Sequence, residues 1–568
     1  MAARWLWVLF AIFRVLWCLA PQTGYLHPDE FFQSPEVMAG DILNLQTYRP
    51  WEFNTSFPCR TAVFPLLTSG AMFWMLQSLQ HSCLGIDAIS GYTLLIFPRL
   101  CMTLLSFMLD YAVYHSAPFW RAHQWTSMLL LSGSYVTLVF YTRTLANAVE
   151  GILFAMLLFL VATDLRNHRA ATKLPNSHLK HASMIGIVTV AGFFNRPTFL
   201  GFAAAPVLYW LSQVSTVNMS PFSIARFLQN SMKMVPAAVF TAIVFIVADT
   251  LYFSSGIPLH GVTWTDITSL WKVITYVQHN VVLTPCNFLI YNLDTQNLAK
   301  HGIHSRATHF IINSTMLFGV LHVSAVISGL KIIKNSIKKK IMQQQQVTKK
   351  SQRSMPIVSE CHSLLLLFYF TPLTLLSLFC HQEPRFLIPL IVPLALFIAS
   401  QGEVKWKTVV IYNILGALMF GWLHQGGIIP GLSHLEQVIH SRGQGSQLQK
   451  TFIFYHTYMP PRFLLNTDKK HDSVKIIDLF GAEEQVLCRV LEELIHSTFH
   501  LGGSEKTTNS CFYVIAPGTV TNSVQSCKIL FTNVWSFFPH VTMEDLPELH
   551  SLPGNWLSQL SLYIFEVK

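Results

Sequence analysis

Long apolar runs, separated by short polar segments, recur through the first three quarters of the chain. They fall at about 4–20, 97–116, 124–142, 145–163, 183–194, 199–214, 232–252, 311–331, 361–380, 385–401 and 408–425. Most of them approach the roughly 20 residues with which a helix crosses a bilayer, where each backbone polar group must be paired within its own segment. The pattern therefore predicts a polytopic α-helical membrane protein with about eleven transmembrane helices.

The first apolar run has two possible interpretations. It is short and follows Arg4, as a signal peptide would. However, Arg14 interrupts the apolar stretch, and no small-x-small cleavage site precedes Pro21. We therefore expect an uncleaved anchor, with its basic end in the cytosol and the chain from residue 21 onward on the luminal side.

Basic residues support this orientation, because they concentrate in alternate connections and above all in a basic cytosolic loop at 331–358. The first luminal loop is then 21–96 and the second is 253–310. A further apolar run at 62–80 would invert every later segment if it crossed the membrane. We interpret it as an interfacial or re-entrant luminal helix.

The last part of the chain has a different pattern. The β-like runs TFIFYH, VKIIDLF, CFYVIAP, KILFTNVW and LSLYIFEV alternate with a helical stretch near 483–496. Strands that alternate with helices are typical of an α/β domain. We therefore predict a small luminal α/β domain at 426–568 beside a transmembrane domain at 1–425. Cys511 and Cys527 could form a disulfide there, a point that spacing leaves open.

The composition agrees with a membrane protein. Apolar residues (AVILMFWYC) make up 52% of the 568 residues and charged residues only 12%, about half of the roughly 25% usual in soluble domains. This excludes a string of soluble domains. The net charge of +10 is explained better by basic loops that face lipid headgroups than by nucleic-acid binding.

The sharpest polar cluster follows the first span directly. It contains His27, Asp29, Glu30, Gln33 and Glu36. Neighbouring carboxylates at a membrane surface are candidates for perturbed pKa values, and one of them could take a proton from an attacking hydroxyl. The alternative is a solvated helix start, in which an acidic residue only caps the helix.

Further polar groups lie at the ends of other predicted spans, on the same luminal side. They are Arg143, Asn147 and Glu150, spaced to share one helical face; Asn195 and Arg196; His301, His304, Arg306 and His309; and His381, Glu383 and Arg385. Trp51 and Arg60 of the first luminal loop could complete the acidic side. Charged groups at membrane depth usually serve a site or path.

These groups suit a phosphate better than a metal, because no carboxylate or thiolate completes a regular ligand set beside the histidines. Their alternatives are an Arg143–Glu150 ion pair, a solvated loop, and an arginine that only extends to the interface. The acids on one side of such a site suit an acceptor with a hydroxyl group. The arginines on the other side suit a lipid-linked phosphate that leaves in the reaction.

The motifs HPDEFFQSPEV, RTLANAVE, NRPT, HGIHSRATH and HQEPRF occur in this order. Together they resemble the dolichyl-phosphate-mannose-dependent α-mannosyltransferases of the endoplasmic reticulum, glycosyltransferase family 22, which have the GT-C fold. The resemblance covers about residues 1–425 and is greatest to the branch that extends GPI-anchor precursors. Ser305 stands where relatives often have proline.

The resemblance implies an inverting, metal-independent transferase in the endoplasmic reticulum membrane, with no cofactor. It would add a fourth, α-1,2-linked mannose to the third mannose of a GPI precursor. Asp29 would be the base, with Glu30 as second choice. His304, Arg306, Arg385 and His301 would bind the donor phosphate. The alternatives are transfer of the third GPI mannose, transfer to a lipid-linked N-glycan precursor, and, from another class, a lipid transporter or flippase.

Among the glycosylation sequons, only the one at Asn54 lies in a predicted luminal loop away from a span. A glycan is therefore expected at Asn54.

Overall fold

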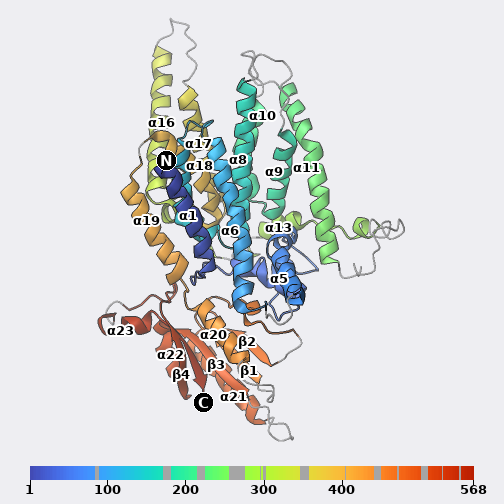
Figure 1. Cartoon of the computed structure of the whole chain (residues 1–568), viewed down its shortest axis with the longest axis vertical. Coiled ribbons are helices and arrows are strands. Elements are labelled where there is room, and N and C mark those ends of the chain that lie inside the picture. The colour runs from blue at the N-terminus through green and yellow to red at the C-terminus, as the bar shows by residue number, and fades with distance from the viewer. Residues whose placement is uncertain are drawn as a thin grey trace. The chain divides into compact units, whose positions relative to one another are not determined.

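The computed structural model describes residues 1–82, 88–170, 181–213, 224–254, 275–294, 296–297, 302–345, 357–402, 404–440, 449–469, 473–500, 510–527, 529–548 and 552–568. The chain forms two compact units (Figure 1). The first unit comprises Met1–Arg14, Trp51–Phe64 and Thr103–Asn413, and the second comprises Val15–Pro50, Pro65–Met102 and Ile414–Lys568. Four of the described helices contribute residues to both units: α1 (Ala2–Leu19), the short α4 (Val63–Pro65), α6 (Gly91–Ser116) and α19 (Trp406–Leu418).

The first unit is a bundle of apolar helices. Its longer members are α7 (Gln124–Ser132), α8 (Ala146–Ala170), α9 (Ala182–Asn195), α10 (Phe199–Gln213), α11 (Ile224–Phe253), α13 (Thr284–Leu293), α16 (Val320–Gln345), α17 (Ile357–Ser377) and α18 (Ile391–Gln401). Helix α8 packs on α9 and α10, and α9 packs on α11, so these four helices lie side by side (Figure 1). Helix α17 packs on α10 and α18.

The predicted polytopic helical architecture is confirmed. Within the described residues, six helices are long and apolar enough to cross a membrane: Ala2–Leu19, Gly91–Ser116, Ala146–Asn167, Phe227–Phe253, Pro384–Gln401 and Trp406–Leu423. Shorter apolar helices occupy Ala182–Asn195, Phe199–Ser212, His309–Phe318 and Cys361–Ser377. The predicted apolar runs are therefore helical, but several are shorter than a full span or are divided.

The run at 311–331 shows why a run can be divided. A short helix, α15 (Ser314–Phe318), ends at Gly319, which has a positive φ of 50° and precedes α16. A Cβ at Gly319 would lie 2.8 Å from the Tyr412 ring. Only glycine combines this backbone conformation with so close a neighbour.

The first half of the predicted basic loop at 331–358 is helical. Helix α16 continues through the basic stretch as far as Gln345. Lysine and glutamine are strong helix formers, so the helix extends beyond its apolar part. Residues 346–356 lie outside the described residues.

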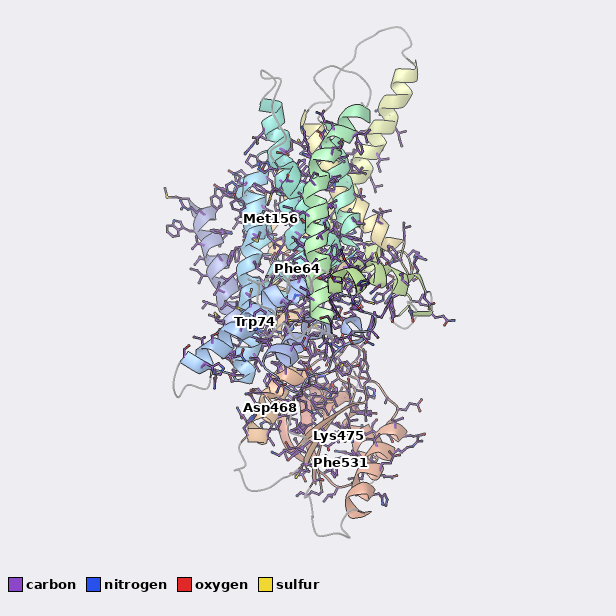
Figure 2. The ribbon with its side chains drawn as sticks, turned by 90° about the vertical axis from the view of Figure 1, so that its right-hand side faces the viewer. Phe64, Trp74, Met156, Asp468, Lys475 and Phe531 are labelled. Carbon is purple, nitrogen blue, oxygen red and sulfur yellow. A yellow bond between two sulfur atoms is a disulfide. The ribbon has the colours of Figure 1, made fainter. Side chains whose placement is uncertain are left out.

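The second unit contains the predicted α/β region. Five strands form a sheet in the order β2-β1-β3-β5-β4: β1 (Gln449–Phe454), β2 (Val474–Asp478), β3 (Ser510–Pro517), β4 (Phe531–Phe537) and β5 (Leu562–Val567). Strands β1, β2 and β3 are parallel, and β5 joins antiparallel to β3 and β4. Lys475 of β2 and Phe531 of β4, labelled in Figure 2, belong to the two edges of the sheet.

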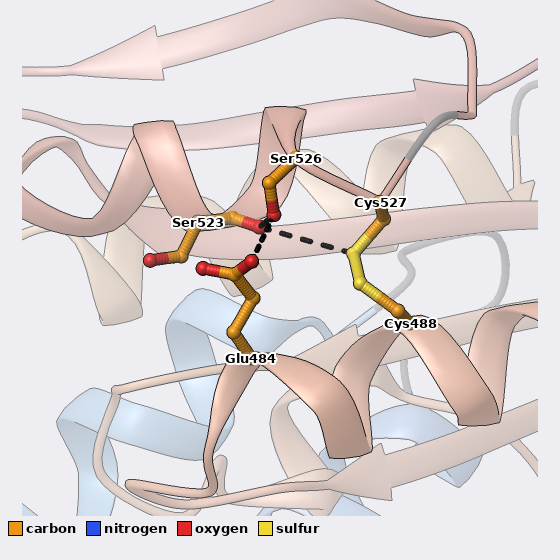
Figure 3. Close-up of a disulfide and its surroundings, with 5 residues drawn as sticks. All are labelled: Glu484, Cys488, Ser523, Ser526 and Cys527. Carbon is orange, nitrogen blue, oxygen red and sulfur yellow. Dashed lines mark hydrogen bonds between the residues drawn. A yellow bond between two sulfur atoms is a disulfide. The ribbon is translucent and has the colours of Figure 1, made fainter.

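Helix α21 (Glu484–His500) closes the core of this region. Its Leu487 and Leu491 lie on one helical face and pack with Ile453 of β1 and Val514 of β3. Cys488 of the same helix forms a disulfide with Cys527 (Figure 3). The pairing of Cys511 with Cys527 that the sequence left open is therefore not formed, because Cys527 is bonded to Cys488.

Candidate active site

The two adjacent acids of the first cluster have different surroundings. Asp29 begins α2 (Asp29–Phe32), a single turn that follows Pro28. Its side chain is 23% exposed and accepts a hydrogen bond from Gln33 Nε2. The Asp29 N–H donates to His27 Nδ1 over 3.1 Å, and this nitrogen lies 3.4 Å from Asp29 Oδ1. Asp29 is therefore an accessible carboxylate held by its local turn.

Glu30 is fully buried in an ion pair. Arg99 of α6 donates from Nε to Glu30 Oε1 over 2.8 Å, and its Nη2 lies 2.6 Å from the same oxygen. Arg99 Nη1 also donates to the carbonyl of Gln22 over 3.1 Å. A carboxylate paired in this way holds α2 against α6, and of these two adjacent acids Asp29 is the accessible one. Sequence reasoning missed Arg99, although a charge inside an apolar run is a signal for it.

Glu36 is also completely buried, in the first turn of α3 (Pro35–Ile42). Its Oε1 accepts the backbone N–H of Tyr48 over 2.8 Å and of Arg462 over 3.2 Å. Its Oε2 accepts the N–H of Phe463 over 3.3 Å. Burial raises the pKa of Glu36 to about 7, against the opposing effect of these N–H donors and of the Arg462 charge.

The first unit holds the second chemical cluster, around Glu383. Its Oε1 lies 3.0 Å from His381 Nε2, and its Oε2 accepts a hydrogen bond from Arg385 Nε. Arg385 is the second residue of a 3₁₀ helix, Pro384–Leu390, and is 7% exposed. The Arg385 and Arg196 guanidinium carbons lie 5.2 Å and 5.0 Å from the centre of the Phe386 ring. The structure thus brings two predicted arginines to one aromatic ring.

The predicted face of Arg143, Asn147 and Glu150 is only partly correct. Helix α8 begins at Ala146, so Arg143 lies in the preceding turn rather than on the helix. Asn147 Nδ2 donates to Glu150 over 3.4 Å. Arg196 Nε lies 3.7 Å from Glu150 Oε2.

The end of α9 contacts the start of α8. Asn195, the last residue of α9, donates from Nδ2 to the carbonyl of Ala146 over 3.0 Å. Thr198 donates to Glu150 over 2.7 Å. The predicted groups Asn195, Arg196 and Glu150 therefore connect α8 and α9 beside the Phe386 ring.

The histidine loop joins this cluster through a residue that sequence reasoning missed. The N–H of His304 donates to the Cys380 carbonyl over 2.9 Å. Gln382 is buried, and its Oε1 accepts the N–H of His309 over 2.7 Å while its Nε2 donates to the Arg306 carbonyl over 3.4 Å. The Arg306 side chain is exposed. His301 lies outside the described residues. The position of Gln382 inside HQEPRF was the available signal.

A cavity of about 360 Å³ lies beside the arginine cluster. Arg196, Thr198, Asn292 and His381 supply its polar groups. The other lining residues are mostly apolar and come from α10 and the residue Pro197 before it, from α13, from α17 and the two residues after it, and from the start of the 3₁₀ helix: Pro197, Leu200, Gly201, Phe288, Leu289, Leu375, Leu376, Leu378, Phe379 and Phe386. An apolar cavity with a cationic margin suits a lipid that carries an anionic group.

Trp51 and Arg60 belong to the first unit, not to the unit that contains Asp29. Arg60 donates to Glu52 over 2.6 Å and 3.1 Å, and both side chains are buried. Trp51 stacks on Tyr291 of α13, with the ring centres 4.1 Å apart. Both residues thus have partners within their own unit, and their expected place beside the acidic cluster stays a prediction. Asn54 is exposed, as a glycan acceptor must be.

Two acids inside predicted spans are also structural. Asp110 of α6 pairs with Arg14 of α1 over 2.7 Å, and both are buried. Asp249 of α11 accepts hydrogen bonds from Thr61 and Thr284, each over 2.8 Å. Both acids therefore have structural partners, whereas a transporter would use such charges along its substrate path.

The helical bundle and the Arg–His–Glu cluster beside an apolar cavity define a multi-pass membrane enzyme that suits a lipid-borne anionic group. The chain belongs to the Alg9-like mannosyltransferase family, whose model matches residues 5–465. The resemblance drawn from the motifs is thereby confirmed, and the chain is a glycosyltransferase.

Among its relatives is the human protein named GPI alpha-1,2-mannosyltransferase 4, with 45% identity over 100% of this chain and 94% of the relative. GPI mannosyltransferase 4 of Saccharomyces cerevisiae is 26% identical over 92% of this chain and 91% of its own. A solved structure of ArnT from Cupriavidus metallidurans bound to undecaprenyl phosphate matches with a TM-score of 0.41 at 9% identity, covering 100% of this chain and 98% of that one.

Proposed function

We propose that the protein is an inverting α-1,2-mannosyltransferase of the endoplasmic reticulum membrane. Its donor is dolichyl phosphate mannose, and its acceptor is the third mannose of a GPI-anchor precursor, which gains a fourth mannose. The full-length identity of 45% to a protein named for this step supports the acceptor. The observation that carries the chemistry is the arginine and histidine cluster beside an apolar cavity.

The reaction needs one base and one stabilised leaving group. The acceptor hydroxyl oxygen attacks the anomeric carbon, and Asp29 takes the hydroxyl proton. The bond between the anomeric carbon and the phosphate oxygen breaks, and dolichyl phosphate leaves with the electron pair. Attack from the face opposite the phosphate converts the β donor into an α product. A positioned base contributes roughly 10²–10⁴-fold to such a rate.

The leaving phosphate is assigned to Arg385 and His381, with Arg196 and His304 nearby. Fixed cations in a partly dry site stabilise developing negative charge more than they would in water. Glu383 accepts from Arg385 Nε and contacts His381, so it fixes the direction of both donors. Such a donor set matches phosphate chemistry without a metal ion.

The luminal location also belongs to this proposal. The Cys488–Cys527 disulfide supports a luminal C-terminal region, because disulfides persist in oxidising compartments.

The test is a transfer assay with the full chain in microsomes from cells that lack the endogenous activity. Radiolabelled dolichyl phosphate mannose is supplied with a trimannosyl GPI precursor, and the wild type is compared with Asp29→Asn and Arg385→Ala. We expect transfer by the wild type alone, with all three proteins present at equal level. Transfer only to a dimannosyl GPI or to a lipid-linked oligosaccharide would move the enzyme to another step of its family. No transfer to any acceptor would favour a transporter.

A further inference from the structure

Glu36 is an unusual acid for a residue so near the proposed base. It lies seven residues after Asp29, fully buried, and its carboxylate accepts three backbone N–H groups. A buried carboxylate is costly unless hydrogen bonds compensate its lost hydration. Two of the three donors, Arg462 and Phe463, come from a segment more than 400 residues further along the chain.

We propose that Glu36 is a positioning residue that fastens the segment 461–465 to α3 and thereby sets the position of Asp29. The C-terminal region is then a working part of the transferase. This inference rests on the proposed role of Asp29 as base. We call the contact of Glu36 with the N–H groups of Arg462 and Phe463 the clamp.

Helix α2 needs such support because it has only four residues. A single turn is too short to be stable on its own, so its neighbours fix its position. Phe31 of α2 is buried, with its ring centre 6.1 Å from that of Phe463 and 5.0 Å from that of Tyr25. Tyr25 in turn donates its hydroxyl to the Met459 carbonyl over 2.9 Å. The segment 461–465 therefore contacts α3 through Glu36 and also contacts, through Phe463, the turn that carries Asp29.

A second set of contacts connects the residues that follow α3, Leu45 and Gln46, to the C-terminal sheet and the segment before β2. Leu45 forms an antiparallel bridge with Asp468, which is labelled in Figure 2. The Gln46 N–H donates to the Thr467 carbonyl over 2.8 Å. Gln46 Nε2 donates to the carbonyl of Val474, the first residue of β2, over 3.2 Å. The clamp is thus continuous with an edge of the C-terminal sheet.

Arg462 offers a selective way to open the clamp. It is the first residue of a 3₁₀ helix, Arg462–Leu465, and follows Pro461, whose ψ is 108°. Proline is accepted at a first helical position, and an extended preceding residue is compatible with it. Arg462→Pro removes the N–H that binds Glu36. Arg462→Ala removes the same side chain and keeps the N–H, so it is the matched control.

The experiment measures kcat for mannose transfer and KM for dolichyl phosphate mannose in the full-length protein. A displacement of a catalytic group by about 1 Å costs on the order of 100-fold in rate. We expect Arg462→Pro and Glu36→Gln to lower kcat about 10- to 100-fold relative to Arg462→Ala and the wild type. KM for the donor should stay within about 2-fold, because the residues assigned to the donor phosphate are in the other unit.

A stability control separates positioning from general damage. Leu491→Ala removes a core side chain from α21, which is not part of the clamp. It should lower the melting temperature and leave kcat of the folded protein unchanged. The inference is overturned if Arg462→Pro and Arg462→Ala have the same kcat, or if Leu491→Ala lowers kcat as much as the clamp variants do. Failure of the proposed function would look different, since the wild type itself would transfer no mannose.

Discussion

The buried pair of Glu30 and Arg99 makes the clearest prediction about which carboxylate does what. The two side chains are 0% and 2% exposed, and Arg99 approaches Glu30 Oε1 through both Nε and Nη2. Replacing Arg99 by alanine leaves a carboxylate buried without its counter-charge and removes the donor to Gln22. Breaking a buried pair by removing one partner costs about 3–5 kcal/mol.

The double variant Glu30→Gln with Arg99→Met should recover much of this loss. It removes both charges and keeps similar side-chain volumes, and such replacements of buried pairs are often close to neutral. The assay measures the melting temperature of the full chain in detergent. Samples are heated to a series of temperatures, and the folded protein that remains is measured by fluorescence-detected size-exclusion chromatography. Arg99→Ala should melt far below the wild type, with the double variant between them. Additive losses in the double variant would contradict the ion-pair argument.

The same series separates structure from chemistry. Glu30→Gln should lower the melting temperature and leave measurable transfer in the protein that remains folded. Asp29→Asn should melt like the wild type and lose about 10²–10⁴-fold in rate, as expected for a removed general base. If folded Glu30→Gln loses transfer while Asp29→Asn retains it, the assignment of Asp29 as base is refuted.

Four shorter predictions concern other parts of the molecule. Arg385→Lys keeps the charge but loses the planar fork, so kcat/KM for the donor should fall about 10-fold or more, measured by transfer at varied donor concentration. Replacing Cys488 and Cys527 by serine should destabilise the C-terminal region by about 2–4 kcal/mol, seen as faster limited proteolysis. Asp249→Ala leaves the buried hydroxyls of Thr61 and Thr284 without their acceptor, which should lower the free energy of unfolding by about 1–3 kcal/mol for each. An unchanged melting temperature would contradict the structural role of Asp249. Burial raises the pKa of Glu36 to about 7, so the native state binds this proton more tightly than the unfolded chain does. The free energy of unfolding should therefore fall as pH rises from about 5 to 8. Melting temperatures measured across this range should depend less on pH in Glu36→Gln than in the wild type.

The sequence determined most of what depends on neighbours along the chain, although the extension of α16 to Gln345 was not expected. Apolar runs predicted the helices because the length of a span and the pairing of its backbone are local properties. Alternation of strands and a helix predicted the C-terminal sheet, and short motifs predicted the family. The acids near Asp29 and the arginine Arg385 were identified in the same way, because charges next to apolar runs are rare and costly.

Only the tertiary structure decided how these residues are used. Glu30 and Asp29 are adjacent in the sequence, yet one is buried against Arg99 and the other is accessible. Cys527 pairs with Cys488, a choice that spacing could not make. Which residue pairs with which depends on segments that are far apart in the sequence and pack together only in the folded chain. A local sequence pattern contains no information about which distant segments meet.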